Sequence, residues 1–254
     1  MPVAWLNPAG GLRYHVRARL AARDWQPFRA AIADWLPAFD APSARALLVG
    51  PSAGYTFPDA FFSQFSAITV LEPDPIAGFL ICRRLRKLGI ATRLERSDRL
   101  IAPLLHGGGH GLEAELQRDP AACLIFGNLL GQTRFLLRDP DFERFKLAFR
   151  ERIEPLLTGR AWLSFHDRVS GSLAPNFRQP YAAPERLNDR SVLGLLYPSP
   201  EPGAKVELFD HESGGFFPSN LPHTYFHWQL GRGRHHLIEG VISNPESWRS
   251  GALG

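Results

Sequence analysis

The residue types best suited to chemistry stand at the ends of two short apolar runs. The run ARALLVG ends in a glycine-containing turn, GPSAG, at positions 50–54, and the run AITVLE ends in the acidic Glu72. Glycines let backbone amides approach a ligand closely, and the N-terminus of a following helix favours a carboxylate or a phosphate. A carboxylate at the end of the next strand can accept two hydrogen bonds from a ribose diol. The pattern therefore predicts a site for a nucleotide-like cofactor.

The same acids also have a structural use. Ser52 would add a hydroxyl donor to the turn, whereas Glu72 and Asp74 stand just before an expected helix, where a carboxylate can cap free N–H groups. An unpaired carboxylate is costly at a buried strand end, which favours a ligand as the partner of Glu72. The sequence leaves both roles open for this residue.

The turn also matches a rival motif. The letters GPSAG fit GxSxG, the strand-to-helix elbow that exposes a nucleophilic serine in α/β-hydrolases, and positions 106–109 spell HGGG, an oxyanion-loop signature. A triad can be drawn from the following residues: Ser52, Asp167 or Asp210, and His223 or His235. Chain order argues against a hydrolase, because the oxyanion loop normally precedes the elbow and only about 45 residues precede the first strand here.

Histidines elsewhere give weaker signals. His166 and Asp167 end a later apolar run, GRAWLSFHD, and are candidates for proton handling or substrate orientation, although they could equally cap the next segment. His223 and His227 would share one face of a strand, but no third ligand accompanies them. We therefore predict no metal site.

Alternating apolar runs and helical patterns predict the scaffold that positions these residues. Helices are expected between successive strands, and HTYFHWQL and HHLIEGVIS should form a closing hairpin. The strands are expected at 44–50, 67–72, 90–98, 121–132 and 159–167. Strands that alternate with helices indicate a parallel sheet covered on both faces.

The predicted fold class is α/β, a Rossmann-like, doubly wound, mostly parallel sheet that ends in an antiparallel hairpin. Aromatic residues at helical spacing make residues 1–44 an N-terminal helical cap. The main domain then spans 45–254 and carries an insertion at about 168–220, where proline and glycine are frequent.

Composition narrows the class of protein. A chain of 254 residues, 44% hydrophobic and 21% charged, can bury one sizeable core. It has no run of about 18 uncharged apolar residues and no secretory signal pattern, which predicts a cytoplasmic protein without a membrane partner.

Cys82 and Cys123 lie far apart in apolar segments, which predicts that both are reduced residues of the core. The net charge of +4 comes from scattered arginines, densest at 83–99, where a solvated helix face is favoured over a phosphate-binding track.

Together these features resemble the class I S-adenosylmethionine-dependent methyltransferases over about residues 45–245. In that family a glycine-rich turn follows the first strand, here LLVGPSAGY, and an acidic residue ends the second, here VLEPDP. A polar or acidic residue after the third strand contacts the adenine, and the fourth strand ends beside the methyl donor. The resemblance assigns cofactor contacts to Gly50, Pro51, Ser52, Gly54, Glu72, Pro73, Asp74, Ser97, Asp98, Asn128 and Leu129.

The resemblance implies an enzyme that transfers a methyl group from S-adenosylmethionine to an acceptor, with His166 and Asp167 as candidate catalytic residues. The acceptor stays open between a small molecule, an RNA and a protein, and the sequence does not indicate an oligomeric state. The chain departs from the family in having GPSAG in place of GxGxG. The alternatives are a serine hydrolase that uses Ser52 and a Rossmann-like binding protein without catalysis.

Overall fold

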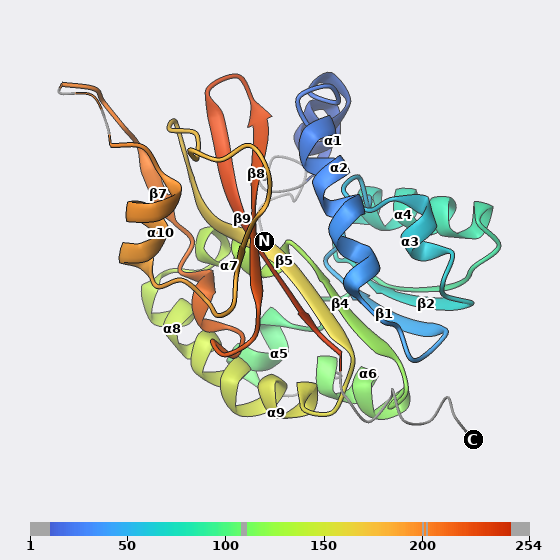
Figure 1. The fold of residues 1–254 in the computed structure, drawn as a ribbon. Coiled ribbons are helices and arrows are strands. Elements are labelled where there is room, and N and C mark those ends of the chain that lie inside the picture. Colours follow the sequence, from blue (N-terminus) through green and yellow to red (C-terminus); the bar gives the residue numbers. More distant parts are fainter. Residues whose placement is uncertain (1–10, 108–110, 200, 202, 245–254) are drawn as a thin grey trace.

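A single twisted sheet organises the chain (Figure 1). The computed structural model describes residues 11–107, 111–199, 201 and 203–244. The strands follow the order β3-β2-β1-β4-β5-β9-β8-β6, and β7 pairs with β5. They are β1 (Arg45–Val49), β2 (Ala67–Leu71), β3 (Ala91–Glu95), β4 (Cys123–Gly127), β5 (Trp162–Gly171), β6 (Tyr181–Ala183), β7 (Leu208–Asp210), β8 (His223–Gly231) and β9 (Arg234–Ser243).

The direction of the strands confirms the predicted fold class. Strands β1 to β5 pair in parallel, whereas β9 runs antiparallel to β5, and β8 and β9 form the expected hairpin. From β1 the chain builds the sheet outward through β2 and β3, then returns to place β4 on the other side of β1. This reversal makes the carboxyl ends of β1 and β4 the point where an open α/β sheet forms its ligand crevice.

Helices cover both faces of the sheet, as Figure 1 shows. On one face lie α1 (Gly11–Leu20), α2 (Gln26–Trp35), the 3-10 turn η2 (Leu36–Ala38), α3 (Asp59–Phe62) and α4 (Pro75–Lys87). On the other lie α5 (Ile101–His106), α6 (Leu112–Arg118), α7 (Leu129–Leu136), α8 (Asp139–Ala148), the π-turn η3 (Phe149–Ile153) and α9 (Glu154–Leu157). The 168–220 segment adds α10 (Asp189–Leu196) and the 3-10 turn η4 (Ser213–Gly215).

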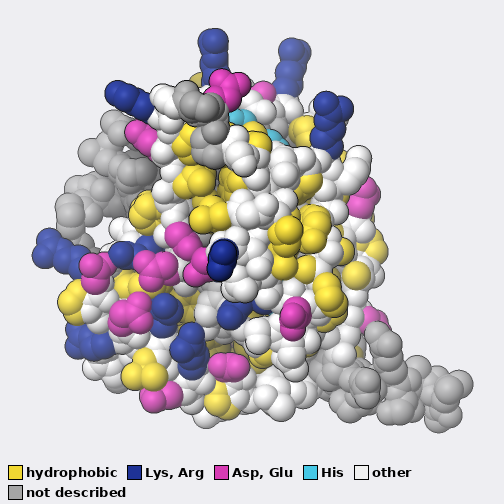
Figure 2. Space-filling view, turned by 60° about the vertical axis from the view of Figure 1, so that its left-hand side comes forward, with side chains coloured by type: hydrophobic (Ala, Val, Ile, Leu, Met, Phe, Trp, Pro, Cys, Tyr) yellow, Lys and Arg dark blue, Asp and Glu magenta, His cyan; other side chains and the backbone are white. Residues whose placement is uncertain are grey.

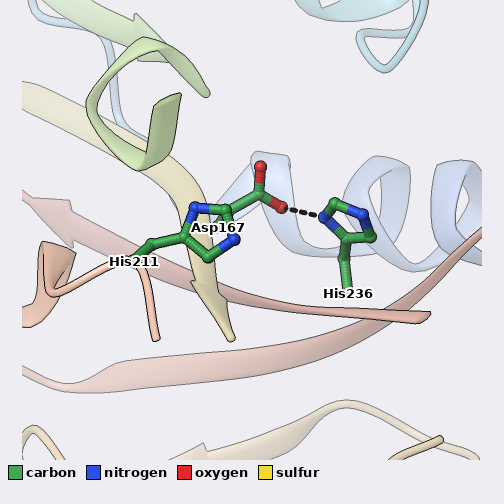
Figure 3. Close-up of side chains that lie close together, drawn as sticks. All are labelled: Asp167, His211 and His236. Atoms are coloured by element: carbon green, nitrogen blue, oxygen red, sulfur yellow. Dashed lines mark hydrogen bonds and ion pairs between the residues drawn. The ribbon is translucent and has the colours of Figure 1, made fainter. Parts of the chain in front are cut away.

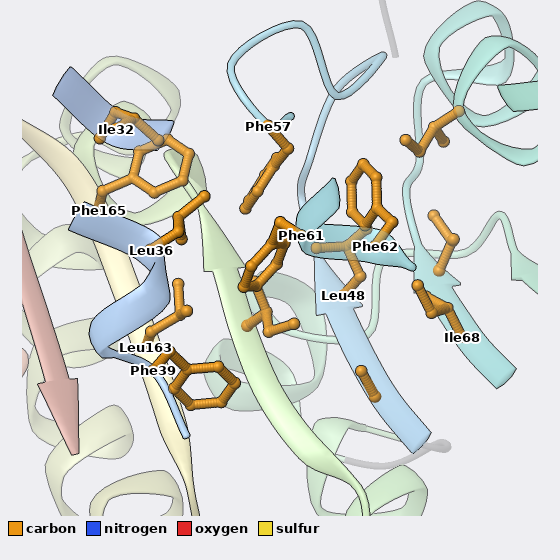
Figure 4. Packing of buried hydrophobic residues seen from close by; sticks show 14 of the residues in the cluster. Ile32, Leu36, Phe39, Leu48, Phe57, Phe61, Phe62, Ile68, Leu163 and Phe165 are labelled. Atoms are coloured by element: carbon orange, nitrogen blue, oxygen red, sulfur yellow. The ribbon is translucent and has the colours of Figure 1, made fainter. Parts of the chain in front are cut away.

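Strand β1 shows why the central runs are apolar throughout. Leu48 packs into the cluster under α2 and α3, together with Ile68 and Phe62 (Figure 4). The next side chain along the strand, Val49, enters the cluster on the opposite face, under α5 to α9. Because both faces are covered, alternation of apolar and polar residues is absent, as expected for a central parallel strand.

The helical segment at residues 11–38 is anchored to the closing hairpin by aromatic packing. The ring of Phe28 stacks on Trp228 with 4.9 Å between centroids, and Trp25 meets the same indole edge-on at 4.8 Å. The indole N–H of Trp25 also donates to the carbonyl of Leu230 at 3.3 Å. These contacts fix α2 against β8 and so place α1 beyond the upper ends of β1 and β4 (Figure 1).

Three predicted element boundaries were wrong. The fourth strand ends at Gly127 because Asn128 has a φ of 62°, after which α7 begins. The fifth strand continues to Gly171, four residues beyond the predicted end at Asp167. The third strand ends at Glu95, three residues before the predicted end at Asp98, because the carboxylate of Asp98 already accepts N–H groups at the start of α5.

The distribution of surface charge and the burial of the cysteines agree with the sequence analysis. On the face that carries α8 and α10, acidic and basic side chains are interspersed and form no block of one sign (Figure 2). Cys82 and Cys123 are both buried and free. In the described part of the chain, no helix is long and apolar enough to cross a membrane.

Candidate functional site

The turn after β1 and the acid after β2 meet at the reversal point of the sheet. The backbone N–H of Ser52 donates to Oε2 of Glu72 at 2.8 Å, and the N–H of Asp74 donates to Oε1 at 3.0 Å. The two segments are neighbours because β1 and β2 pair in parallel with Val49 opposite Leu71. The structure thus brings together the two features on which the cofactor prediction depends.

The turn itself requires glycine at both ends. Gly50 and Gly54 have φ values of +58° and +69°, in the left-handed region that L side chains rarely adopt. A side chain at Gly50 would overlap the Cβ of Leu129, and one at Gly127 would come within 2.8 Å of the Cα of Pro51. The end of β4 and the start of α7 therefore pack directly against this turn.

Burial strongly perturbs Glu72, which is only 6% exposed. Desolvation raises the pKa of its carboxyl to about 7, although the N–H groups of Asp74 and Ser52 act in the opposite direction. Each carboxylate oxygen accepts one N–H and retains a second lone pair. A vicinal diol needs two such acceptors, so the residues present fit a ribose.

Asp74 is the residue that caps helix α4. Its Oδ1 accepts the N–H groups of Ile76 and Ala77, at the start of α4, and Pro75 occupies the first turn of that helix. Its Oδ2 accepts the N–H of Gly11 at 2.7 Å. Asp74 therefore caps α4 and ties down α1, while Glu72, separated from it by Pro73, is the acid that faces the turn.

The predicted adenine contacts lie after β3. The carboxylate of Asp98 accepts the N–H groups of Leu100, Ile101 and Ala102 and so organises the start of α5. Ser97 precedes it in the loop. Among the described residues, no hydrogen bond joins Ser97 or Asp98 to the turn at 50–54, and their contact with an adenine stays a prediction.

Asn128 links the cofactor side of the crevice to β5. Its amide nitrogen donates to Oδ2 of Asp167 at 3.1 Å, and its amide oxygen accepts the backbone N–H of Asp167 at 2.8 Å. The left-handed backbone of Asn128 turns this side chain across the top of the parallel pair β4 and β5. Two residues predicted separately, one for the cofactor and one for chemistry, are thus direct partners.

Asp167 is the centre of a buried polar cluster (Figure 3). Its Oδ1 lies 2.7 Å from Nδ1 of His236 on β9, and its Oδ2 also accepts the amide of Gln132. Burial alone would raise the pKa of this carboxyl, but the nearby His236 and His211 and the amide of Asn128 together lower it to about 2. The carboxylate is therefore held in its charged form.

A β-bulge sets up this cluster. The pairing of β5 with β9 shifts between Asp167 and Val169, which leaves Arg168 as an extra residue. In a regular strand, Asp167 and Ser170 would face opposite sides, since three positions separate them. With the bulge, Asp167 contacts His236 while the hydroxyl of Ser170 contacts Nε2 of His211 at 2.9 Å.

His166 points to the other face of β5 and not towards Asp167. Its Nδ1 lies 3.0 Å from the hydroxyl of Ser164, and its Nε2 lies 3.6 Å from the buried carboxylate of Glu239. Arg168 and His223 approach the same carboxylate. Burial raises the pKa of Glu239, but hydrogen bonds from His166 and His223 and the charge of Arg168 outweigh this effect and keep it low. The expectation that His166 and Asp167 end the fifth strand is wrong, because β5 continues to Gly171 and alternation places the two side chains on opposite faces.

Helix α1 contacts the segments that follow β1 and β2. Nδ1 of His15 lies 3.0 Å from the hydroxyl of Tyr55. The pKa of Tyr14 is raised, mainly by burial, and the charges of both Asp167 and Glu72 contribute to the shift. Tyr14 therefore lies within electrostatic range of both acids.

In the described residues, Ser52 lacks the hydrogen-bonded partners that a serine hydrolase needs. Ser52 has a φ of 53°, as a strained elbow would, but no hydrogen bond joins its hydroxyl to a histidine within the described residues. The two triad histidines are occupied elsewhere, His223 with Glu239 and His235 with His227. Of the HGGG motif, Gly108 and Gly109 lie outside the described residues.

Sequence reasoning missed three members of the cluster. His211 lies in the 168–220 segment, where no periodic pattern identifies it, and Gln132 falls within the run interpreted as a strand. His236 is visible as a neighbour of His235, but its partner Asp167 is 69 positions away. Only the antiparallel pairing of β9 with β5 brings them together.

Known proteins similar to this chain are found among solved structures. No family model matches the chain, and no curated protein does. Among solved structures, the chain is similar to the N-methyltransferase NodS from Bradyrhizobium japonicum bound to S-adenosylhomocysteine, with 14% identity, coverage of 96% of this chain and 95% of that one, and a TM-score of 0.41.

Two further structures are similar over most of their length. One is an S-adenosylmethionine-dependent methyltransferase from Clostridium acetobutylicum, with 13% identity, coverage of 94% and 83% of the two chains, and a TM-score of 0.36. The other is CalS10, an amino pentose methyltransferase from Micromonospora echinaspora, with 14% identity, coverage of 92% and 85%, and a TM-score of 0.34. At these values the similarity adds nothing to what the strand order establishes.

Proposed function

We propose that this protein is a methyltransferase that uses S-adenosylmethionine. The observation that supports this most directly is the contact between the Ser52 amide and the Glu72 carboxylate, at the reversal point of a parallel sheet. A nucleoside held there would have its ribose hydroxyls beside Glu72 and its remaining length along the turn at 50–54. When bound, such a cofactor supplies an electrophilic methyl group.

The protein's own contribution to methyl transfer is mainly positioning. The glycine turn and Glu72 would hold the nucleoside, and Asn128 would lie at the end of the site that leads to β5. Of the two candidates for catalysis, we propose Asp167, since His166 packs against Glu239 on the other face. Tyr14 and α1 would exclude water from above.

Calorimetric titration with S-adenosylmethionine and S-adenosylhomocysteine tests the proposal. Both should bind, and Glu72→Gln should weaken binding by about 1.5–3 kcal/mol, because a buried charged acceptor is lost. Glu95→Gln is the matched control, as Glu95 ends the adjacent strand but pairs with Arg93 and Arg99. It should leave binding unchanged, and a thermal melt of each variant shows that it is folded.

Two results would contradict the proposal. Absence of binding by both ligands to the folded chain would rule out the cofactor. Equal affinity in wild type and in Glu72→Gln would rule out the ribose contact of Glu72, which is the observation that supports the proposal.

A further inference from the structure

Three side chains that can ligate a metal lie together on the β5 side of the crevice. Asp167 comes from β5, His211 follows β7, and His236 comes from β9 (Figure 3). One ligand atom from each lies within 4.8 Å of the other two. All three are well covered, and His236 is the most accessible, with 13% of its side chain exposed.

His211 is fixed in a tautomer that can coordinate a metal. Its Nδ1 lies against the carbonyl of Gly131, and since a carbonyl only accepts, this nitrogen must carry the proton. Nε2 is then a lone-pair nitrogen, and it receives the hydroxyl of Ser170. A backbone carbonyl that orients an imidazole is the usual outer partner of a metal-binding histidine.

The carboxylate of Asp167 is oriented in a comparable way. The amides of Asn128 and Gln132 both donate to Oδ2. Oδ1 is directed to His236. Hydrogen bonds to one oxygen leave the other available, which is how ligating carboxylates are held.

An aromatic shell borders the cluster on two sides, with Phe135 and Phe209 at the protein surface. Phe135 and Phe209 stack on each other at 4.5 Å and meet the ring of His211 edge-on at 4.9 and 5.1 Å. On the other side, the ring of Trp228 lies 5.9 Å from that of His236. Such a shell lowers the local dielectric constant, which strengthens the attraction between a cation and the Asp167 carboxylate.

We propose that Asp167, His211 and His236 bind one divalent ion of the Zn²⁺ type. The ligands would be a carboxylate oxygen, Nε2 of His211 and Nδ1 of His236, with water in a fourth position. Two imidazoles and one carboxylate suit zinc and similar transition metals, whereas Mg²⁺ and Ca²⁺ prefer oxygen ligands.

Two local changes accompany binding. The hydroxyl of Ser170 gives up Nε2 of His211, and the proton between His236 and Asp167 leaves Nδ1. Nε2 of His236 can take that proton, since it forms no hydrogen bond within the described residues. With an ion bound, Asp167 would act on an acceptor by holding the metal and not as a free base.

Metal titration tests the proposal without a cofactor or an acceptor. The full-length protein is treated with a chelator, dialysed and titrated with Co²⁺, whose visible absorption reports a site of low coordination number, and Zn²⁺ is then added in competition. We expect one equivalent of Co²⁺ to bind and to be displaced by Zn²⁺. His211→Gln and His236→Gln should each abolish the absorption. Gln132→Ala removes only an outer partner and should weaken Zn²⁺ binding about 10–100-fold.

His227→Gln is the matched control, because His227 lies on the same hairpin but pairs with His235. It should bind Co²⁺ like the wild type, and Zn²⁺ should raise the melting temperature of both proteins but not of His236→Gln. The proposal is overturned if no Co²⁺ binds, if the His211 and His236 variants bind it unchanged, or if His227→Gln alone abolishes binding. Titration of S-adenosylhomocysteine into the same samples is a separate measurement, so failure of either proposal is recognised independently.

Discussion

The raised pKa of Glu72 makes cofactor affinity dependent on pH. A ribose diol donates to an ionised carboxylate, so only the deprotonated protein binds strongly. With a pKa of about 7 in the free protein, about one molecule in eleven is ionised at pH 6 and about ten in eleven at pH 8. Affinity for S-adenosylhomocysteine should therefore increase about 10-fold between these pH values, which corresponds to about 1.4 kcal/mol.

Calorimetry at pH 6, 7 and 8 measures this dependence, and two variants isolate its origin. Glu72→Gln should bind more weakly but with an affinity independent of pH over this range, apart from any titration of the ligand. Glu95→Gln should keep the wild-type dependence, because a hydrogen bond from Arg99 keeps the pKa of Glu95 low. A flat wild-type profile, or the same slope in Glu72→Gln, would refute the assignment of the titrating group.

Other predictions concern stability and the rival function. Because the pKa of Glu72 is raised, its contribution to the free energy of unfolding is present below pH 4.5 and is lost as the pH rises through about 7. Urea unfolding over this pH range should show that wild type loses about 3 kcal/mol of stability relative to Glu72→Gln. Gly50→Ala places a side chain at positive φ against Leu129 and should cost about 2 kcal/mol in the same assay. Phe28→Ala removes a fully buried ring and should cost about 3–5 kcal/mol. A fluorophosphonate probe should not label Ser52, and labelling that disappears in Ser52→Ala would instead support a hydrolase.

The sequence predicts the fold well where local pattern and tertiary environment agree. Strands β1 and β2 are short apolar runs buried on both faces, and the closing hairpin has alternating residues around a glycine turn, so their types and order can be read directly. Boundaries fail where a single residue decides them. Nothing in the pattern shows that Asn128 adopts a positive φ and converts the rest of an apolar run into α7.

The candidate site also has one part that the sequence predicts and one part that it does not. Glu72 and the turn at 50–54 can be predicted because each ends a strand, and parallel neighbours end at the same edge. The Asp167 cluster cannot, since His211 and His236 reach it only through antiparallel pairing and a bulge. The spacing of residues in the sequence does not reveal a bulge. From the sequence alone, His166 and Asp167 therefore appear equally suited to chemistry.

The extra residue in β5 has a consequence for how this region can vary in length. Removing Arg168 would restore strict alternation without a change of register, because Asp167 already lies opposite Ile238 and Val169 opposite Leu237. Ser170 would stay beside His211, and Val169 would stay in its apolar cluster. Deletion of Arg168, like a substitution there, would therefore remove its ion pairs and leave both clusters in place. Homologues of this chain should therefore tolerate the loss of one residue at this position as well as its replacement.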